Sequence, residues 1–245
     1  LHDALPIYKK GWWNFVKVQD YDNDGDLDIL AGNVGLNTRL KASATYPVKM
    51  YYADFDDNGT REQILTYYLQ GKEIPFSNMM EIQKQIPMLK KKFLYAREFA
   101  EASIEEIFSK EKLQSAIVHE ANYFENTLFV NNGNMEFEAK ALPHEAQLTS
   151  YYDAHLTDFN EDGLVDVFIT GNYYDCNIQM GRYDADYGSI LINKGQGEFE
   201  YIDPAGVEVK NQVRRVEEIS LADGTKALVL AKNNDALQVI TITKN

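Results

Sequence analysis

One nine-residue pattern of acidic residues occurs three times in the chain, and it limits the possible folds more than any other feature. The copies read DYDNDGDLD at 20–28, DFDDNGTRE at 54–62 and DFNEDGLVD at 158–166. Each has an acid at positions 1 and 9, Asp or Asn at positions 3 and 5, and glycine at position 6. Carboxylates placed this densely repel one another strongly unless a cation lies between them. The pattern therefore predicts three tight loops that each surround a cation.

The spacing within each copy favours calcium. Alternate residues of a tight loop turn their side-chain oxygens inward, and Ca²⁺ takes about 6–8 oxygen ligands. Glycine at position 6 accepts the positive φ that lets such a loop curl around an ion. Position 7 varies between copies, which indicates that its backbone carbonyl is the ligand. We expect two to three calcium ions, and the first loop, with most carboxylates, should bind tightest. The predicted ligands are Asp20, Asp22, Asp24, Asp26 and Asp28 in the first loop, Asp54, Asp56, Asn58, Thr60 and Glu62 in the second, and Asp158, Asn160, Asp162, Leu164 and Asp166 in the third.

Two simpler interpretations of the loops compete with this one. A single cluster of Asp, Asn and Gly is most often a solvated turn, but three copies with the same spacing and flanks argue against chance. An EF-hand needs a bidentate Glu at position 12, where this chain has Ala31, Leu65 and Ile169. Those residues lie in apolar runs rich in β-branched and aromatic side chains, which predict strands. Each copy therefore predicts a strand, a calcium loop and a second strand.

Two further segments resemble each other, LFVNNGNMEFEAKALP at 128–143 and ILINKGQGEFEYIDPAG at 190–206. Each joins two apolar strands through a turn, at Asn132-Gly133 and Lys194-Gly195, where glycine accepts a positive φ. Together with the strand–loop–strand units they predict a four-stranded antiparallel sheet, clearest at 148–203. Short strands repeated with turn signals indicate an all-β propeller or sandwich.

The acidic loop, the apolar strand after it and an L-x-x-N-x-G-x-G-x-F hairpin together resemble the FG-GAP/VCBS repeat family, which includes the integrin α-subunit propeller. Residues 11–37, the helical insert and NNDALQV near the end are most similar to bacterial VCBS-repeat proteins of the ASPIC/UnbV-associated kind. The resemblance implies a β-propeller of four-stranded antiparallel blades with calcium in loops between strands. The side chains at positions 1, 3, 5 and 9 of the three loops match the family's ligands.

Residues 77–118 predict an α-helical insertion in this propeller. Ser103 and Glu106 form a capping-box pattern before apolar residues at helical spacing, and Pro87 is expected to end the first helix. The insertion could cover a ligand, contact another domain or pack on a blade. Subtracting its 42 residues from 245 leaves about 200, enough for three to four blades at roughly 40–50 residues each. The chain, 1–245, is therefore expected to form a partial propeller.

Composition excludes several classes of function. The formal net charge of −14 argues against a nucleic-acid partner, because an acidic surface repels phosphates. No apolar run approaches the roughly 18 residues of a membrane helix, and the single Cys176 excludes an internal disulfide. Leu1 is not an initiator Met, so we read the chain as a fragment. Weak calcium loops fill where calcium is near millimolar, which favours an extracellular, cell-surface or bacterial periplasmic location.

The expected function is a non-catalytic binding module for a protein or a carbohydrate at the cell surface. The alternative is the propeller domain of a carbohydrate-active enzyme. The chain has no histidines at zinc-ligand spacing and none of the common nucleophile or phosphate-binding motifs. We therefore assign no catalytic residue.

Aromatic residues suggest where a ligand would bind. Faces that could stack on a sugar are offered by Trp12, Trp13, Tyr51-Tyr52, Tyr67-Tyr68, Tyr151-Tyr152 and Tyr173-Tyr174. Adjacent residues on a strand point to opposite faces, so one member of each pair is expected in the core and only the other can reach a ligand. The polar loop with Arg182, Tyr183 and Asp184 is our predicted ligand-facing segment, and a plain connection between strands is the alternative.

Overall fold

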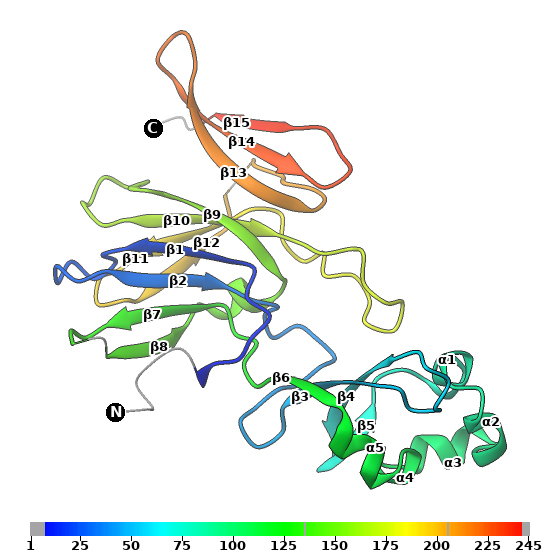
Figure 1. The fold of residues 1–245 in the computed structure, drawn as a ribbon. Coiled ribbons are helices and arrows are strands. Elements are labelled where there is room, and N and C mark those ends of the chain that lie inside the picture. Colours follow the sequence, from blue (N-terminus) through cyan, green and yellow to red (C-terminus); the bar gives the residue numbers. More distant parts are fainter. Residues whose placement is uncertain (1–7, 135, 205, 242–245) are drawn as a thin grey trace. The chain divides into compact units, whose positions relative to one another are not determined.

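The computed structural model describes residues 8–134, 136–204 and 206–241, and these form four antiparallel sheets, three with four strands and one with three. The all-β prediction is confirmed, and the described α-helices all lie in one region of the chain (Figure 1). The chain divides into two compact units. Residues up to Thr38 and from Phe124 onward form the first unit, and Arg39–Tyr123 form the second.

Two sheets of the first unit are built alike. One contains β1 (Phe15–Gln19), β2 (Asp28–Gly32), β7 (Thr127–Asn131) and β8 (Phe137–Ala141), and the other contains β9 (Tyr151–Thr157), β10 (Asp166–Gly171), β11 (Ser189–Asn193) and β12 (Phe199–Ile202). In both, the strands pair in chain order. The second unit is inserted between β2 and β7, where the other sheet has only residues 172–188. The four-stranded unit predicted at 148–203 and the two hairpins are thus confirmed.

The third sheet of the first unit contains β13 (Val213–Ser220), β14 (Lys226–Lys232) and β15 (Gln238–Thr241). The first strands of the three sheets are neighbours, with β9 in contact with both β1 and β13. Figure 1 shows the third sheet above the second and the second above the first. Within the described residues the sheets do not close into a ring.

A buried carboxylate links the three first strands. Asp153 on β9 is 1% exposed and accepts the backbone N–H of Val216 on β13 at 2.9 Å. The ammonium group of Lys17 on β1 lies 2.8 Å from one of its oxygens, and the guanidinium of Arg215 on β13 lies 3.5 Å from the other. Because one buried anion serves three sheets, we expect their packing to depend on it.

Apolar side chains fill the spaces between the sheets. Leu30 and Leu128 from the first sheet pack in one cluster with Val167 and Leu191 from the second, and all four are fully buried. Each such leucine contributes roughly 1.5–3 kcal/mol by leaving water. Phe168 points the other way from Val167 and packs against the third sheet. This explains why residues 167–169 of β10 are all apolar: the strand is buried on both faces.

The second unit has a sheet of a different order. Its strands are β3 (Val48–Ala53), β4 (Glu62–Leu69), β5 (Lys72–Pro75) and β6 (Ile117–Ala121), paired as β5-β4-β3-β6. The last strand in the chain therefore pairs with the first, unlike the sheets of the first unit. The second acidic loop lies here, between β3 and β4, and belongs to a separate unit from the other two loops.

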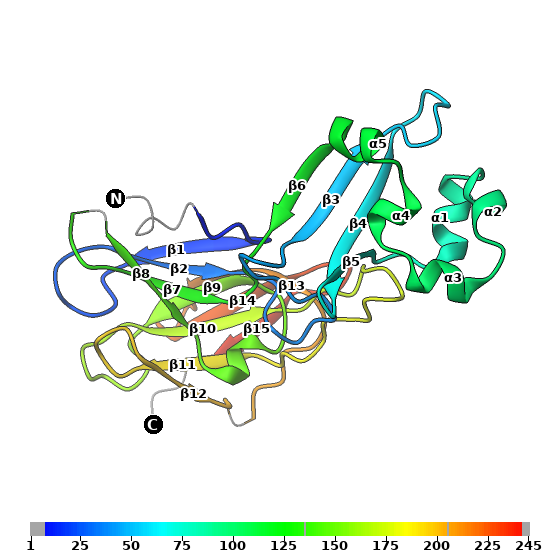
Figure 2. The ribbon, with the colours of Figure 1, turned by 90° about the horizontal axis from the view of Figure 1, so that it is seen from below.

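Five short helices pack on the second unit's sheet, as Figures 1 and 2 show. They are α1 (Met79–Gln85), α2 (Leu89–Lys92), α3 (Ala96–Glu101), α4 (Ile104–Ile107) and α5 (Lys110–Ser115). All lie inside the predicted insertion. The capping box of α4 is present, with reciprocal hydrogen bonds between Ser103 and Glu106 of 3.2 and 2.7 Å. As expected, α1 ends before Pro87. In the first unit, a 3₁₀ helix, η2 (His144–Gln147), precedes β9.

Candidate metal centres

The three acidic loops have the same backbone form. Each joins two neighbouring antiparallel strands, β1 to β2, β3 to β4 and β9 to β10, as predicted. Two residues of each loop have a left-handed backbone, at positions 4 and 6. The φ values at position 6 are 96° at Gly25, 85° at Gly59 and 87° at Gly163, and those at position 4 are 61° at Asn23, 60° at Asp57 and 62° at Glu161. Glycine is needed at position 6 because a side chain there would strain the backbone.

The loops also share one hydrogen-bond pattern. The carboxylate at position 1 accepts the glycine N–H, the side-chain oxygen at position 5 accepts the N–H of position 7, and the carboxylate at position 9 accepts the N–H of position 2. For the glycine bond the distances are 3.0 Å to Asp20, 2.8 Å to Asp54 and 2.9 Å to Asp158. At position 9 they are 2.8 Å to Asp28, 2.9 Å to Glu62 and 2.8 Å to Asp166. Glu62, although longer than Asp, therefore closes its loop in the same way.

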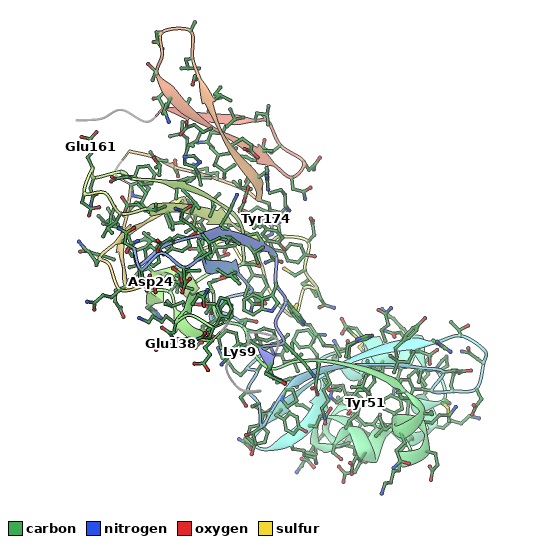
Figure 3. The ribbon with its side chains drawn as sticks, turned by 60° about the vertical axis from the view of Figure 1, so that its left-hand side comes forward. Lys9, Asp24, Tyr51, Glu138, Glu161 and Tyr174 are labelled. Atoms are coloured by element: carbon green, nitrogen blue, oxygen red, sulfur yellow. The ribbon has the colours of Figure 1, made fainter. Side chains whose placement is uncertain are left out.

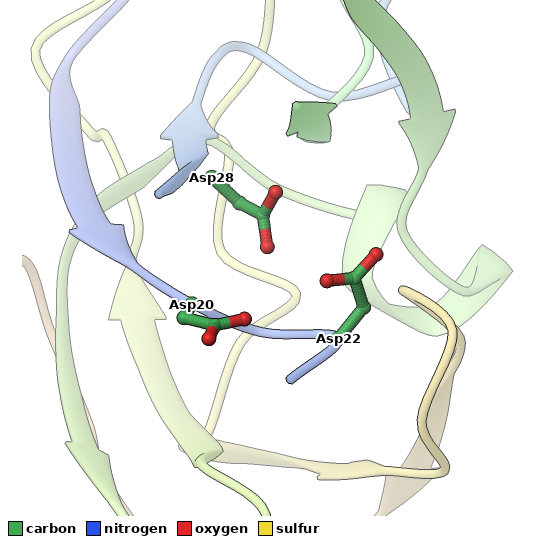
Figure 4. A group of neighbouring side chains, drawn as sticks. All are labelled: Asp20, Asp22 and Asp28. Carbon is green, nitrogen blue, oxygen red and sulfur yellow. The ribbon is translucent and has the colours of Figure 1, made fainter. Parts of the chain in front are cut away.

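In the first loop, three carboxylates converge. Oxygens of Asp20, Asp22 and Asp28 all lie within 4.8 Å of one another, and Figure 4 shows the three groups pointing toward a common space. Asp28 is fully buried, and backbone N–H groups satisfy both of its oxygens. Burial, together with the carboxylates of Asp28 and Asp24, raises the pKa of Asp22. Oδ1 of Asp20 is buried with no hydrogen-bond partner in the described part of the chain.

The second loop brings together Asp54, Asp56 and Glu62 within the same distance. In this loop the orphaned oxygen is Oδ1 of Asp56, at position 3 instead of position 1: it too is buried and without a partner among the described residues. A helix supplies a positive charge to this loop. Lys112 of α5 donates to the backbone carbonyl of Asp54 at 2.7 Å and forms an ion pair with Asp57. Burial acts to raise the pKa of Asp54, but the N–H groups of Gly59 and Asn58 and the charge of Lys112 outweigh it and lower that pKa.

The third loop differs at position 3, where Asn160 replaces an acid. Its amide donates to Asp162 at 2.9 Å, and no three acidic groups converge here within the described residues. Burial, helped by Asp162 and Asp158, raises the pKa of Asp166. The remaining predicted ligands are at the expected loop positions, and Asp24, Asp26, Asn58, Thr60 and Leu164 are exposed or half-exposed.

Two asparagines that we did not predict as site residues support the closing carboxylates. The N–H of Asn131 donates to Asp28 at 2.8 Å, and that of Asn193 donates to Asp166 at 2.8 Å. The amide of Asn193 is fully buried and also donates to the carbonyls of Tyr21 at 2.7 Å and Val165 at 3.1 Å. The signal was present in the sequence: each is the asparagine that ends the apolar strand of one of the two similar hairpin segments, LFVN at 128–131 and ILIN at 190–193.

Of the three residues in the predicted ligand-facing segment, one lines a pocket and two do not. Tyr183 lines a pocket of about 390 Å³ in the first unit, and its hydroxyl lies 2.7 Å from that of Thr38. Arg182 stacks on Tyr174, 5.2 Å from the ring centre, and Asp184 is exposed; neither lines the pocket. Of the pair Tyr151-Tyr152, the first is core and the second lines the same pocket.

Comparison with known proteins adds no relatives. No protein-family model matches the chain, and no curated protein and no solved structure matches it. The resemblance to FG-GAP/VCBS repeats therefore rests on the motifs quoted above. In the ranges that the structure describes, no helix is long and apolar enough to cross a membrane.

Proposed function

We propose that this chain is a calcium-stabilised, non-catalytic binding module. The observation that carries the proposal is the pair of orphaned oxygens, Oδ1 of Asp20 and Oδ1 of Asp56, each buried in a triad of converging carboxylates. A buried carboxylate oxygen without a donor or cation is costly, and a neighbouring negative charge adds to the cost. A bound cation removes both penalties.

The donor set favours calcium over other metals. All the converging groups are carboxylates, which suit hard cations, whereas zinc prefers nitrogen and sulfur ligands. Among the hard cations, Ca²⁺ accepts a flexible shell of many oxygens, while Mg²⁺ demands a near-ideal octahedron. The side chains at positions 1, 3, 5 and 9 and the carbonyl at position 7 would hold the ion in each loop. Because Asn160 stands at position 3, the third loop should bind more weakly than the first.

Calcium would act as a staple between strands. Each loop joins two paired strands, so an ion held by both ends of the loop fixes the end of that hairpin. Binding that occurs only in the folded state stabilises it by mass action. The chain has one cysteine and so lacks an internal disulfide that could do the same.

We further propose that the sheets of the first unit are blades of a partial propeller of the FG-GAP/VCBS kind. Three observations support this proposal. Two sheets have the same strand order, and both have an acidic loop between their first and second strands. The first strands of the three sheets, β1, β9 and β13, are neighbours. Weak calcium sites of this sort fill outside cells, which favours an extracellular, cell-surface or periplasmic location. The partner is then a protein or a carbohydrate.

Calorimetric titration of the chelator-treated protein with calcium tests the proposal. We expect two or three sites, with one lost in Asp22→Ala and one lost in Asp56→Ala, because each change removes both a ligand and a charge from a triad. Asp184→Ala, which changes an exposed acid outside the loops, is the matched control and should keep the full number. Absence of calcium uptake would refute the proposal. A turnover screen on polysaccharides tests its non-catalytic part.

A further inference from the structure

The pocket that contains Tyr183 lies at the opposite end of the strands from the acidic loops. Its lining includes Asn14 just before β1, Val34 after β2, Ser150 before β9 and Tyr173 after β10. The acidic loops connect the other ends of these same strands. Figure 3 shows this separation, with Asp24 and Glu161 on one side of the first unit and Tyr174, next to the pocket residue Tyr173, on the other.

Aromatic rings form the walls of the pocket and are held in place by their neighbours. Trp12 is 37% exposed, and its ring packs on Phe124 with centroids 5.0 Å apart. The rings of Tyr152 and Tyr173 lie 6.2 Å apart. Tyr183 is fixed by its hydrogen bond to Thr38. A ligand would thus meet preformed aromatic faces, which reduces the entropy lost on binding.

Some polar groups of the pocket are already paired, and two exposed residues at its rim each keep a free hydrogen-bonding group. The amide of Asn14 donates to the hydroxyl of Ser150 at 3.0 Å and to the carbonyl of Tyr151 at 3.0 Å. At the rim, Asp175 uses one carboxylate oxygen to accept from Asn233 at 3.1 Å, and Asn177 uses its carbonyl oxygen to accept from a backbone N–H at 2.8 Å. Among the described residues, this leaves one carboxylate oxygen and one amide NH₂ without partners, two positions apart in sequence.

Charges around the pocket select against ions. The guanidinium of Arg214 lies 4.0 Å from the ring centre of Tyr152 and 5.8 Å from that of Tyr173. Its described hydrogen-bond partners are carbonyl and amide oxygens, so its positive charge is uncompensated and would repel an organic cation. The carboxylate of Asp175 would repel an anion. Because a positive and a negative side chain lie beside the same pocket, a neutral ligand is favoured.

We propose that this pocket binds a neutral pyranose sugar. The sugar's C–H face would stack on the aromatic walls, one hydroxyl would donate to Asp175, and a neighbouring hydroxyl would accept from the amide of Asn177. A pocket of about 390 Å³ falls within the range of small-ligand sites and would hold one or two sugar rings. The inference rests on the proposed function only in treating the chain as a binding module, and it does not depend on calcium at the loops.

Intrinsic fluorescence provides a direct test. The chain has two tryptophans, and only Trp12 lines the pocket, so Trp13→Phe leaves a single reporter. The calcium-loaded Trp13→Phe protein is titrated with the methyl α- and β-pyranosides of glucose, galactose, mannose, fucose and N-acetylglucosamine. Tetramethylammonium and inorganic phosphate serve as cationic and anionic probes. We expect saturable 1:1 quenching or enhancement by at least one pyranoside and none by the two ions.

A matched pair of variants then locates the site. Asp175→Ala removes a hydrogen bond to a charged group and should weaken sugar binding roughly tenfold or more. Asp184→Ala, an exposed acid of the same connection outside the pocket, should leave it unchanged. Calorimetry on Trp12→Leu should show the same loss as Asp175→Ala.

Three results would overturn the inference: no pyranoside binding, equal losses in Asp175→Ala and Asp184→Ala, or a response to tetramethylammonium or phosphate alone. Calcium uptake measured on the same sample separates this failure from failure of the proposed function. Protein that takes up calcium and binds no sugar refutes the pocket assignment only.

Discussion

The first and second acidic loops have the same local structure in two different surroundings. Both curl through positive φ at positions 4 and 6, and both leave one carboxylate oxygen orphaned. The first lies in a sheet whose strands pair in chain order, and a hairpin asparagine, Asn131, supports its closing acid. The second lies in a sheet of another order beside a helix that supplies Lys112. The nine residues therefore encode the loop, and we expect the surrounding unit to set how strongly each loop holds a cation.

The largest expected effect is a loss of stability in one unit that leaves the other unit unchanged. Asp153→Ala leaves Lys17 and Arg215 without their shared carboxylate and should destabilise the first unit by about 1.5–3 kcal/mol. Both tryptophans belong to the first unit, so denaturation followed by tryptophan fluorescence reports on that unit. The matched core change Ile82→Ala in α1 should cost about 2–5 kcal/mol in the second unit. If Asp153→Ala leaves the fluorescence transition in place, the link between the three sheets is wrong.

A second prediction tests whether burial alone, without neighbouring loop acids, raises the pKa of a carboxyl group. Asp186 is buried and accepts hydrogen bonds from Ser189, Thr170 and two glycine N–H groups, with no loop acid among these partners. Burial raises the pKa of Asp186 from 3.8 to about 6. The folded state therefore prefers the protonated carboxyl, so Asp186 adds to the free energy of unfolding when it is protonated. This contribution is full below pH 3.8 and is lost as the pH rises through about 6. Carbon-13 NMR should show a carboxyl that titrates near pH 6 and is missing in Asp186→Asn. A midpoint near pH 4 would show that the donors outweigh burial.

A third prediction concerns the support of the closing acids. Asn193→Ala keeps the backbone N–H that donates to Asp166 but removes three side-chain hydrogen bonds that hold this N–H in place. Loss of a ligand's own partner costs about 10–100-fold in metal affinity, and because this change acts one step further out, calcium binding to the third loop should weaken by about the lower figure while the second loop is unaffected. Titration calorimetry measures this. Equal weakening at the second loop would contradict the idea that each unit tunes its own site.

The smallest expected effect concerns the lysine that lies beside the second loop and has no equivalent described at the first. Lys112 places a positive charge against the second loop. Lys112→Met should tighten calcium binding there by a few-fold, roughly the size of an exposed charge interaction, and the gain should shrink in high salt. Lys110→Met, on the same helix, is the matched control and should change little. Weaker binding in Lys112→Met would mean that the lysine organises the loop more than it repels the ion.

The parts of the fold that sequence reasoning predicted are those encoded by short-range patterns. The strand–loop–strand units, the hairpins after Leu128 and Leu191 and the capping box at Ser103 each depend on a few neighbouring residues. Strand alternation alone predicted that one of Tyr151 and Tyr152 is core and the other is not, and the structure shows Tyr151 to be the buried one.

What sequence reasoning missed depends on long-range contacts. Nothing local shows that β7, near Leu128, pairs with β2, across the whole second unit. The pocket likewise joins Trp12 to residues more than one hundred positions away. Asn193 reaches the carbonyl of Tyr21, 172 residues away in sequence. Such contacts follow from how sheets stack, which a single sequence does not specify.

Thermal unfolding in millimolar calcium and in excess chelator tests the central claim, that the acidic loops are calcium staples, most directly. Tryptophan fluorescence follows the first unit and far-ultraviolet circular dichroism follows both. Saturating calcium at about 100 times its Kd stabilises the fold by about 2.7 kcal/mol per site, which predicts that chelation lowers the melting temperature of the first unit by about 5–10 °C for each of its sites that calcium had filled. In Asp22→Ala the fluorescence shift should shrink, while the second unit keeps its response. A melting temperature unchanged by chelation would contradict the account and leave the loops as ordinary acidic turns.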